Sequence, residues 1–337
     1  MLNLRDRYDE KDAGWLFTVF IGALMIVSLV LNYIIQFIAL FSEKSFDEIF
    51  HTPAATWTMQ GVLYVFLAFV VFFYHKKNGI SLIKANGFDK KLKVLDYIVA
   101  VVLGVGMLFA FLIFTFLFSY FLQQVGYKDT ASYFKVDSVG TFILGIIIIG
   151  ILPAVTEEIV FRGAVFKGYS KVFKVIPAVL LSALFFMLMH MNVPQFINAL
   201  LTGILMAFIV KFTGNVLVTM IMHFINNFTI ILLTYIESFN SEQIEDELIV
   251  LNSATITPYL IYFGIGCVLL ALGIVYFYIK RDKSKIEEEK EAAVTVFEET
   301  APVVIKQHKD KPLRLLSHAA IGFFASLLVI ILNLVFA

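Results

Sequence analysis

Cysteine and charge are both scarce in this chain, and each shortage argues against a class of protein. Cys267 is the single cysteine among 337 residues, so no disulfide framework is indicated. Lysine plus arginine and aspartate plus glutamate each number 26, which leaves a formal net charge of zero. Without a basic excess, the composition gives no support for a nucleic-acid partner. Charged residues make up 15% of the chain, whereas a soluble domain has about a quarter.

Internal repeats, glycine-rich phosphate loops and low-complexity tracts are also missing from the sequence. Many transporters show an inverted repeat, so its absence counts against a transporter. What the chain has instead is apolar residues, which make up 60% of it and give a mean hydropathy of +0.88. This composition is typical of a polytopic membrane protein. The predicted fold class is an all-α bundle of about 8–9 transmembrane helices with a polar site inside the membrane.

Nine apolar runs predict the helices of this bundle. A helix needs about 20 apolar residues to span the hydrocarbon core of a bilayer. By that measure the expected helices cover residues 14–41, 57–74, 97–122, 139–156, 176–191, 195–211, 215–236, 258–279 and 316–337. The sequence Asn192-Val193-Pro194-Gln195 interrupts two shorter runs, and either a tight turn outside the membrane or a re-entrant break fits it.

Two loops rich in lysine and arginine set the expected orientation, because basic loops are retained on the cytoplasmic side. One follows the second run and one follows the fourth: Lys76, Lys77, Lys84, Lys90, Lys91 and Lys93, then Arg162, Lys167, Lys171 and Lys174. The intervening loops have few basic residues. We therefore predict a multi-pass protein of the plasma membrane, surrounded by the lipid bilayer, with its N-terminus in the cytoplasm.

The chain divides into five regions. Residues 1–138 are expected to contain about three N-terminal helices, and residues 139–236 the core helices that carry the polar side chains. An outer loop and an eighth helix follow over 237–279. Residues 280–318 are a charged cytoplasmic linker, which either a short helix or a disordered segment would fit. The last transmembrane helix covers 319–337.

Polar side chains inside or at the edge of the apolar runs fall into three sets: Glu157, Glu158 and Arg162, then His190, then His223 and Asn227. Ionisable groups are costly in a membrane and therefore point to function, although a lone histidine there is more often a packing residue. Glu158 precedes Arg162 by four residues, which favours an ion pair on one helix face. Glu157 is turned about 100° from its neighbour, so we predict that it is the free carboxylate.

The three sets are expected to meet. His223 and Asn227 are four residues apart and share a helix face. At a rise of 1.5 Å per residue, helices joined by short turns bring Glu157, His190 and this pair to a similar depth. A carboxylate and a histidine can activate water, while a histidine and an asparagine can donate to an oxyanion. No serine or cysteine nucleophile accompanies them, which favours attack by water and predicts a hydrolase.

A metal site is the alternative for the same side chains. Glu157, His190 and His223 are the residue types of a catalytic zinc site, although the His-Glu-x-x-His helix signature is absent. The sequence leaves both chemistries open.

At these residues the chain resembles the CAAX-protease and bacteriocin-processing family, the CPBP or Abi group of intramembrane endopeptidases. Glu157-Glu158-x-x-x-Arg162 is similar to its first motif, Phe186-x-x-x-His190 to its second and His223-x-x-x-Asn227 to its last. The resemblance implies that Glu157 and His190 activate water, that His223 and Asn227 stabilise the oxyanion, and that Glu158 and Arg162 brace the site. Both a metal-dependent mechanism, with a divalent ion such as zinc, and a metal-free one are compatible with it.

The resemblance implies an intramembrane endopeptidase that cleaves a peptide or a membrane-protein segment. The Lys-, Ile- and Phe-rich composition suggests an AT-rich bacterium, in which peptide processing, bacteriocin maturation or immunity is expected rather than cleavage of prenylated CAAX proteins. Two other classes stay open. One is a non-catalytic membrane scaffold that regulates a partner protein, and the other is a proton-coupled transporter that uses the acids and histidines as a relay.

Overall fold

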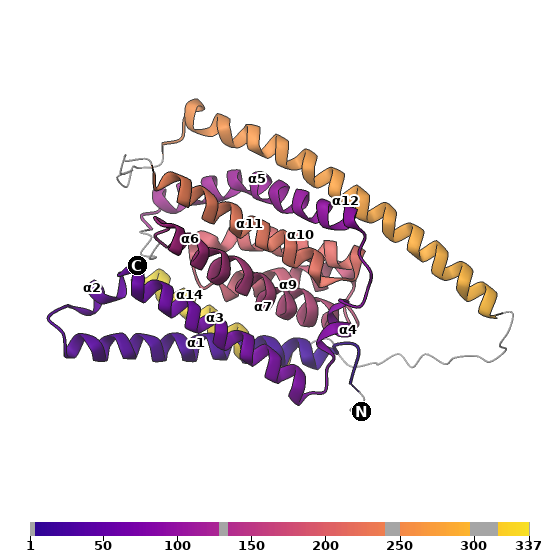
Figure 1. Cartoon of the computed structure of the whole chain (residues 1–337), viewed down its shortest axis with the longest axis horizontal. Coiled ribbons are helices and arrows are strands. Elements are labelled where there is room, and N and C mark those ends of the chain that lie inside the picture. Colours follow the sequence, from indigo (N-terminus) through magenta and orange to yellow (C-terminus); the bar gives the residue numbers. More distant parts are fainter. Residues whose placement is uncertain (1–3, 128–133, 240–249, 297–315, 337) are drawn as a thin grey trace.

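The computed structural model describes residues 4–127, 134–239, 250–296 and 316–336, and its named elements are all helices (Figure 1). Each of the nine apolar runs forms a helix. Eight of them are α1 (Glu10–Leu40), α3 (Pro53–Lys77), α5 (Val94–Gln124), α9 (Val175–Met189), α10 (Phe196–Thr213), α11 (Val216–Glu237), α12 (Ser253–Val296) and α14 (Ser317–Phe336). Two short helices, α2 (Phe46–Phe50) and α4 (Leu82–Asn86), lie in the loops.

The fourth apolar run forms one long helical stretch, Val139–Tyr169. It contains two wider π-helical segments between α-helical ones. In order, its parts are α6 (Val139–Gly145), η1 (Ile146–Ile151), α7 (Leu152–Glu158), η2 (Ile159–Phe166) and α8 (Lys167–Tyr169). Such π segments occur often at functional sites, and here they flank α7, which carries Glu157 and Glu158.

The all-α membrane bundle predicted from composition is confirmed. Within the described ranges, seven helices are long and apolar enough to cross a membrane, and two shorter apolar helices, Val175–Met189 and Ser317–Leu332, accompany them. The 15 residues of α9 extend about 22 Å at 1.5 Å per residue. This is less than the roughly 30 Å thickness of the hydrocarbon core. Because α9 is too short to span the core alone, it must be surrounded by the longer helices that pack around it.

The helices form a middle group with a further group on each side (Figure 1). The middle group consists of Val139–Tyr169 with α9, α10 and α11. On one side lie α1, α3 and α14, where α1 contacts both α3 and α14. On the other side α5 packs along α12. All the predicted site residues come from the middle group, which the flanking helices cover.

A close contact between α9 and α10 positions the end of α9. A Cβ added at Gly203 of α10 would lie 2.8 Å from the Cα of Ala183 in α9, which is closer than real Cβ atoms approach. Small residues permit such close packing of helices in membranes. The interruption predicted at 192–195 is a tight turn with Met191 at a φ of 49° and a 3₁₀ turn, η3 (Val193–Gln195). His190 lies directly before this turn.

Residues ahead of α1 are tied to the loop that follows α3. Arg5 forms a β-bridge with Ile80. The buried hydroxyl of Tyr8 lies 2.7 Å from Nε2 of His75 and accepts a hydrogen bond of 2.8 Å from Nδ2 of Asn86. Burial raises the pKa of Tyr8 far above its ordinary value, so the hydroxyl stays protonated and donates to His75. These contacts bring the N-terminal segment, α4 and the end of α3 to one end of the bundle.

The charged linker begins as a continuation of α12, which extends to Val296, whereas residues 297–315 lie outside the described residues. Lys280 forms an ion pair with Asp96, which is buried near the start of α5. Tyr276 donates a second hydrogen bond to Asp96, of 2.9 Å. Of the two forms predicted for the linker, its first part adopts a helix. The contacts of Lys280 and Tyr276 with Asp96 join α12 to α5.

Candidate active site

A cavity of about 480 Å³ lies between α3, α7, α9, α10 and α11. Glu157, His190, His223 and Asn227, the four predicted catalytic residues, all line it. Glu158 and Arg162 are absent from its lining and are completely buried behind it. The structure therefore brings together the residues that the helix lengths predicted to meet, and it separates the two glutamates as their angular spacing predicted.

Glu157 presents its two carboxylate oxygens to different partners. The hydroxyl of Tyr64 on α3 donates a hydrogen bond of 2.6 Å to Oε1. The other oxygen, Oε2, lies 3.9 Å from Nε2 of His223, which is too far for a direct hydrogen bond. An oxygen atom placed between them at about 2.8 Å from each can bond to both. Glu157 is only 2% exposed, so its carboxylate faces the cavity rather than bulk solvent.

Glu158 connects Arg162 to His223. Its Oε1 accepts a hydrogen bond of 2.8 Å from Nη1 of Arg162 and lies 3.0 Å from Nδ1 of His223. The guanidinium group is always charged, so we assign Glu158 as the carboxylate partner of the pair and Nδ1 of His223 as the donor. The ion pair predicted from the four-residue spacing is present. Its further consequence is that the imidazole of His223 has a fixed orientation, with Nε2 directed toward Glu157.

Phe186 packs between the charged pair and both histidines. The Cζ atom of Arg162 lies 4.1 Å from the ring centroid, which is a cation–π contact. The ring of His190 approaches edge-on with a centroid distance of 4.9 Å, and that of His223 at 6.0 Å. Nε and Nη2 of Arg162 have no hydrogen-bond partner among the described residues. The contact with the face of Phe186 is therefore the main interaction of that part of the guanidinium group.

His190 is held by the last turn of its own helix. Its Nδ1 atom lies 2.8 Å from the backbone carbonyl oxygen of Phe186. A carbonyl oxygen can only accept, so Nδ1 carries the hydrogen and the neutral imidazole has its unprotonated nitrogen at Nε2. This tautomer leaves Nε2 available to accept a proton in the cavity.

Asn227 contacts a carbonyl group in the first π-helical segment. Its Nδ2 donates a hydrogen bond of 2.9 Å to the backbone oxygen of Ile149, and its Oδ1 accepts one of 3.2 Å from Nδ2 of Asn226. The residue four positions after Ile149 is Pro153, which has no N–H to donate to this carbonyl in an α-helix, and the amide of Asn227 donates to it here. The amide group has two hydrogens, so the second remains for a ligand in the cavity.

Several cavity residues were not predicted from the sequence. They are Gln60, Tyr64, Asn198, Thr202 and Asn226. Gln60, Asn198 and Thr202 are polar residues inside apolar runs, and this rarity is a signal that identifies them. Tyr64 gives no such signal, because tyrosine is common near membrane surfaces. Its link to Glu157 spans 93 residues and depends on how α3 packs against α7.

The side chains proposed for a metal do not form a metal site here. Over the described ranges, no group of three or more histidine, cysteine, aspartate or glutamate side chains is arranged to hold a metal ion. Oε1 of Glu157 is engaged by Tyr64, and Nδ1 of each histidine is engaged by a protein oxygen. These bonds leave Oε2 of Glu157 and Nε2 of each histidine unengaged, and a metal-ligating histidine has its other ring nitrogen bonded in the same way. The zinc ligand set of Glu157, His190 and His223 is nevertheless not assembled over the described residues.

One comparison with known protein families gives a match, and it lies in the middle group of helices. Residues 139–229 match the sequence model of the family described as Type II CAAX prenyl endopeptidase Rce1-like. This range extends from the start of α6 into α11 and includes all six residues of the predicted site. No curated protein and no solved structure matches the chain.

Proposed function

Because the chain carries a domain of the Rce1-like type II CAAX prenyl endopeptidase family, a family of proteases, over residues 139–229, we propose that it hydrolyses a peptide bond in the cavity between α3 and α11. The observation that carries this proposal is the convergence of Glu157, His190, His223 and Asn227 on that one cavity. Their donors and acceptors supply a base for water and donors for an oxyanion.

In the proposed reaction Glu157 is the general base. Oε2 takes a proton from a water molecule as the water oxygen attacks the carbonyl carbon of the scissile bond. Tyr64 holds Oε1 at 2.6 Å and so fixes the direction of the carboxylate. Nε2 of His190 is the second acceptor in the cavity and assists in orienting this water. The attack produces a tetrahedral intermediate with a negative charge on the former carbonyl oxygen.

His223 and Asn227 are the proposed donors to this oxyanion. Nδ1 of His223 donates to Glu158, so Nε2 carries a hydrogen only when the imidazole is protonated. The Glu158 carboxylate lies where it stabilises that positive charge. The C–N bond then breaks, and Glu157 returns its proton to the leaving nitrogen. A new carboxyl group and a new amine result, and the site residues regain their starting protonation.

The proposed substrate is a peptide or a membrane-protein segment. Gln60, Asn198 and Thr202 add amide and hydroxyl groups to the cavity wall, and such groups can bond to the backbone of an extended peptide. Oγ1 of Thr202 is buried and has no hydrogen-bond partner in the described part of the chain. Peptide processing, bacteriocin maturation and immunity are the proposed settings.

The test is cleavage of candidate peptides by the full-length protein in proteoliposomes, with products identified by mass spectrometry. Glu157→Gln removes the base but keeps the side-chain shape, and we expect a rate loss of about 100-fold or more. Glu237→Gln, at an exposed position at the end of α11, is the matched control and should retain full activity. Full activity in Glu157→Gln would refute the proposal. A scaffold function would be supported if cellular phenotypes also survived that substitution at normal expression.

A further inference from the structure

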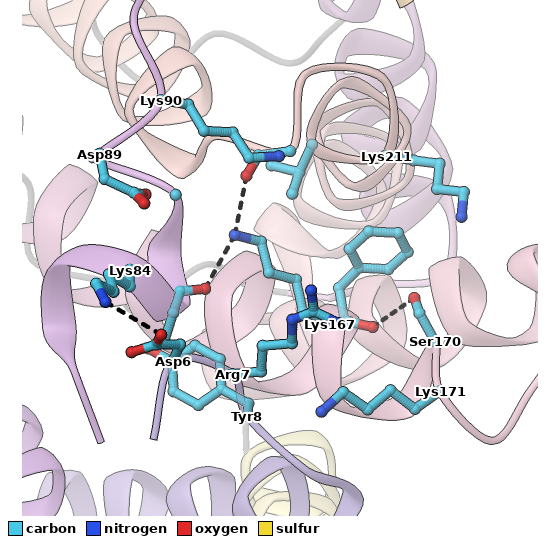
Figure 2. Close-up of a pocket in the computed structure, with 15 residues that line it drawn as sticks. Asp6, Arg7, Tyr8, Lys84, Asp89, Lys90, Lys167, Ser170, Lys171 and Lys211 are labelled. Carbon is cyan, nitrogen blue, oxygen red and sulfur yellow. Dashed lines mark hydrogen bonds and ion pairs between the residues drawn. The ribbon is translucent and has the colours of Figure 1, made fainter. Parts of the chain in front are cut away.

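A second cavity, of about 650 Å³, opens at the end of the helical stretch that carries Glu157 (Figure 2). Its walls come from the N-terminal segment, the loop between α3 and α5, the end of α8 and the end of α10. Six basic side chains line it: Arg7, Lys84, Lys90, Lys167, Lys171 and Lys211. Asp6 and Asp89 are its two acidic side chains, so basic side chains outnumber acidic ones by six to two. We call this cavity the basic pocket.

Most of these charges have no acidic partner. Lys84 pairs with Asp6 at 3.2 Å. By contrast, Arg7, Lys90, Lys171 and Lys211 take part in none of the ion pairs formed by the described residues. Asp9, Glu10 and Asp12 act on Lys171 only from a distance, without an ion pair. The excess of basic over acidic side chains distinguishes the basic pocket from an ordinary surface on which lysines and acids alternate.

Lys167 lies on the floor of the basic pocket and is bonded only to backbone. Its Nζ donates two hydrogen bonds of 3.1 Å, one to the carbonyl oxygen of Ala85 and one to that of Gly214 (Figure 2). An ammonium group has three hydrogens, so one remains for a ligand. Gly214 ends α10 with a φ of 65°, and a Cβ at this position would collide with Nζ of Lys90. Two ammonium groups therefore lie beside the same glycine.

Helix ends account for only part of this charge. The negative end of a helix dipole attracts cations, and this explains Lys211 in the last turn of α10 and Lys167 in α8. It does not explain Arg7, which belongs to the segment before α1, or Lys90, which lies in the loop before α5. Side chains from four separate segments thus converge on a cavity of a size typical for small-molecule ligands.

We propose that the basic pocket binds the phosphate group of an anionic ligand. Ammonium groups are common phosphate binders, and basic pockets between transmembrane helices on the cytoplasmic side recognise phospholipid headgroups. The basic pocket contains four of the lysines that predict the cytoplasmic side: Lys84 and Lys90 from the first basic loop, and Lys167 and Lys171 from the second. The same chemistry suits the headgroup of an acidic phospholipid or a soluble phosphate compound. The proposal is independent of the proteolytic function.

The test uses the full-length protein in a neutral detergent and three probes at constant ionic strength. The probes are dioctanoyl phosphatidylglycerol, dioctanoyl phosphatidylcholine and inorganic phosphate, and the measured quantity is the dissociation constant. In the pocket variant, Lys90→Gln and Lys211→Gln are combined. The control variant combines Lys76→Gln and Lys91→Gln, which remove the same charge at exposed positions outside the basic pocket.

We expect the pocket variant to bind its anionic probe roughly 100-fold more weakly than the control variant, since each charge-assisted hydrogen bond is equivalent to about tenfold or more. A preference for phosphatidylglycerol over phosphatidylcholine that only the pocket variant loses assigns the site to a lipid headgroup. If inorganic phosphate binds more weakly to the pocket variant than to the control variant, and phosphatidylglycerol is not preferred to phosphatidylcholine, the site is assigned to a soluble phosphate ligand. If the double variant does not fold, Lys90→Gln alone repeats the test with about a tenfold effect.

Two results would overturn the proposal. One is equal binding of the anionic probe by the pocket and control variants. The other is wild-type protein that prefers neither phosphatidylglycerol nor inorganic phosphate to the zwitterionic lipid. Thermal unfolding of each variant accompanies the binding measurement, so that a loss of fold is not mistaken for a loss of the site.

Discussion

Glu157 and Glu158 are adjacent in the sequence but contact different partners, because successive side chains on a helix point about 100° apart. Glu158 bonds to Arg162 and His223, and Glu157 bonds to Tyr64 and faces the cavity. One glutamate is thus suited to hold the site and the other to act in it. The difference between these two roles is measurable, since the loss of one should affect stability and the loss of the other should affect activity.

Tyr64→Phe tests the positioning of Glu157. The substitution removes the hydroxyl that donates 2.6 Å to Oε1 and leaves the ring in place. A hydrogen bond to a charged group contributes about 1.5–3 kcal/mol, so we expect kcat/KM to fall about 10- to 100-fold with an unchanged unfolding temperature. Tyr33→Phe, on the exposed face of α1, is the control. Equal cleavage by the two variants would show that Tyr64 does not position the base.

Arg162→Met tests the role of the buried ion pair. The change leaves the fully buried Glu158 without its cationic partner, and breaking such a pair costs about 3–5 kcal/mol. We expect the free energy of unfolding to drop by that amount, and the double change Glu158→Gln with Arg162→Met to recover part of it. Lys135→Gln, which breaks an exposed ion pair with Asp137, should cost no more than about 1 kcal/mol. If Arg162→Met and Lys135→Gln lowered the free energy of unfolding by similar amounts, the stabilising role assigned to the Glu158–Arg162 pair would be contradicted.

At the scale of helices, the site depends on features that interrupt regular α-helix. The π segments η1 and η2 flank α7, and side chains of other helices bond to their carbonyl groups: Asn227 to Ile149, and Ser182 to Phe161 at 2.8 Å. The tight turn after His190 ends α9 beside the cavity. Helices α9 and α11 are thereby attached to the helix that carries both glutamates.

Gly203→Ala tests the contact that positions α9. An added Cβ would lie 2.8 Å from the Cα of Ala183 and 2.9 Å from its Cβ, so the two helices must separate and His190 must shift. Elsewhere in a helix the same change favours folding by up to about 1 kcal/mol. Gly264→Ala, with nothing within 4 Å of the new Cβ, is the control and should be neutral or stabilising. Unchanged activity and unfolding temperature in Gly203→Ala would contradict this role.

The sequence was sufficient to predict the helices and the polar residues at their shared depth, because hydropathy and the rise per residue are local properties. It did not predict the contact between Tyr64 and Glu157 or the bond from Lys280 to Asp96, since each joins helices far apart in the chain. The π segments were also missed. Pro153, between the two segments, signals an interruption of the helix, but the isoleucine- and valine-rich residues on either side of it do not indicate π-helix rather than α-helix.

At the scale of the whole molecule, the basic loops and the N-terminal segment lie at one end of the bundle, and the orientation argument predicts that this end is cytoplasmic. Cysteine labelling tests it in a Cys267→Ala background, which removes the single native cysteine, exposed on α12. A membrane-impermeant maleimide added to intact cells should label Glu43→Cys and leave Lys171→Cys unlabelled until the membrane is opened. The reverse pattern would invert the predicted topology.

The most direct test of the central claim, that Glu157 acts as the base of a membrane peptidase, is a comparison of peptide termini in the cell that makes the protein. Membrane and secreted peptides are sequenced from a deletion strain that carries the wild type, Glu157→Gln or no copy, with equal expression of the first two. The account predicts a set of new C-termini that is present with the wild type and missing from both other strains. The same set of termini in the Glu157→Gln strain as in the wild type would contradict it.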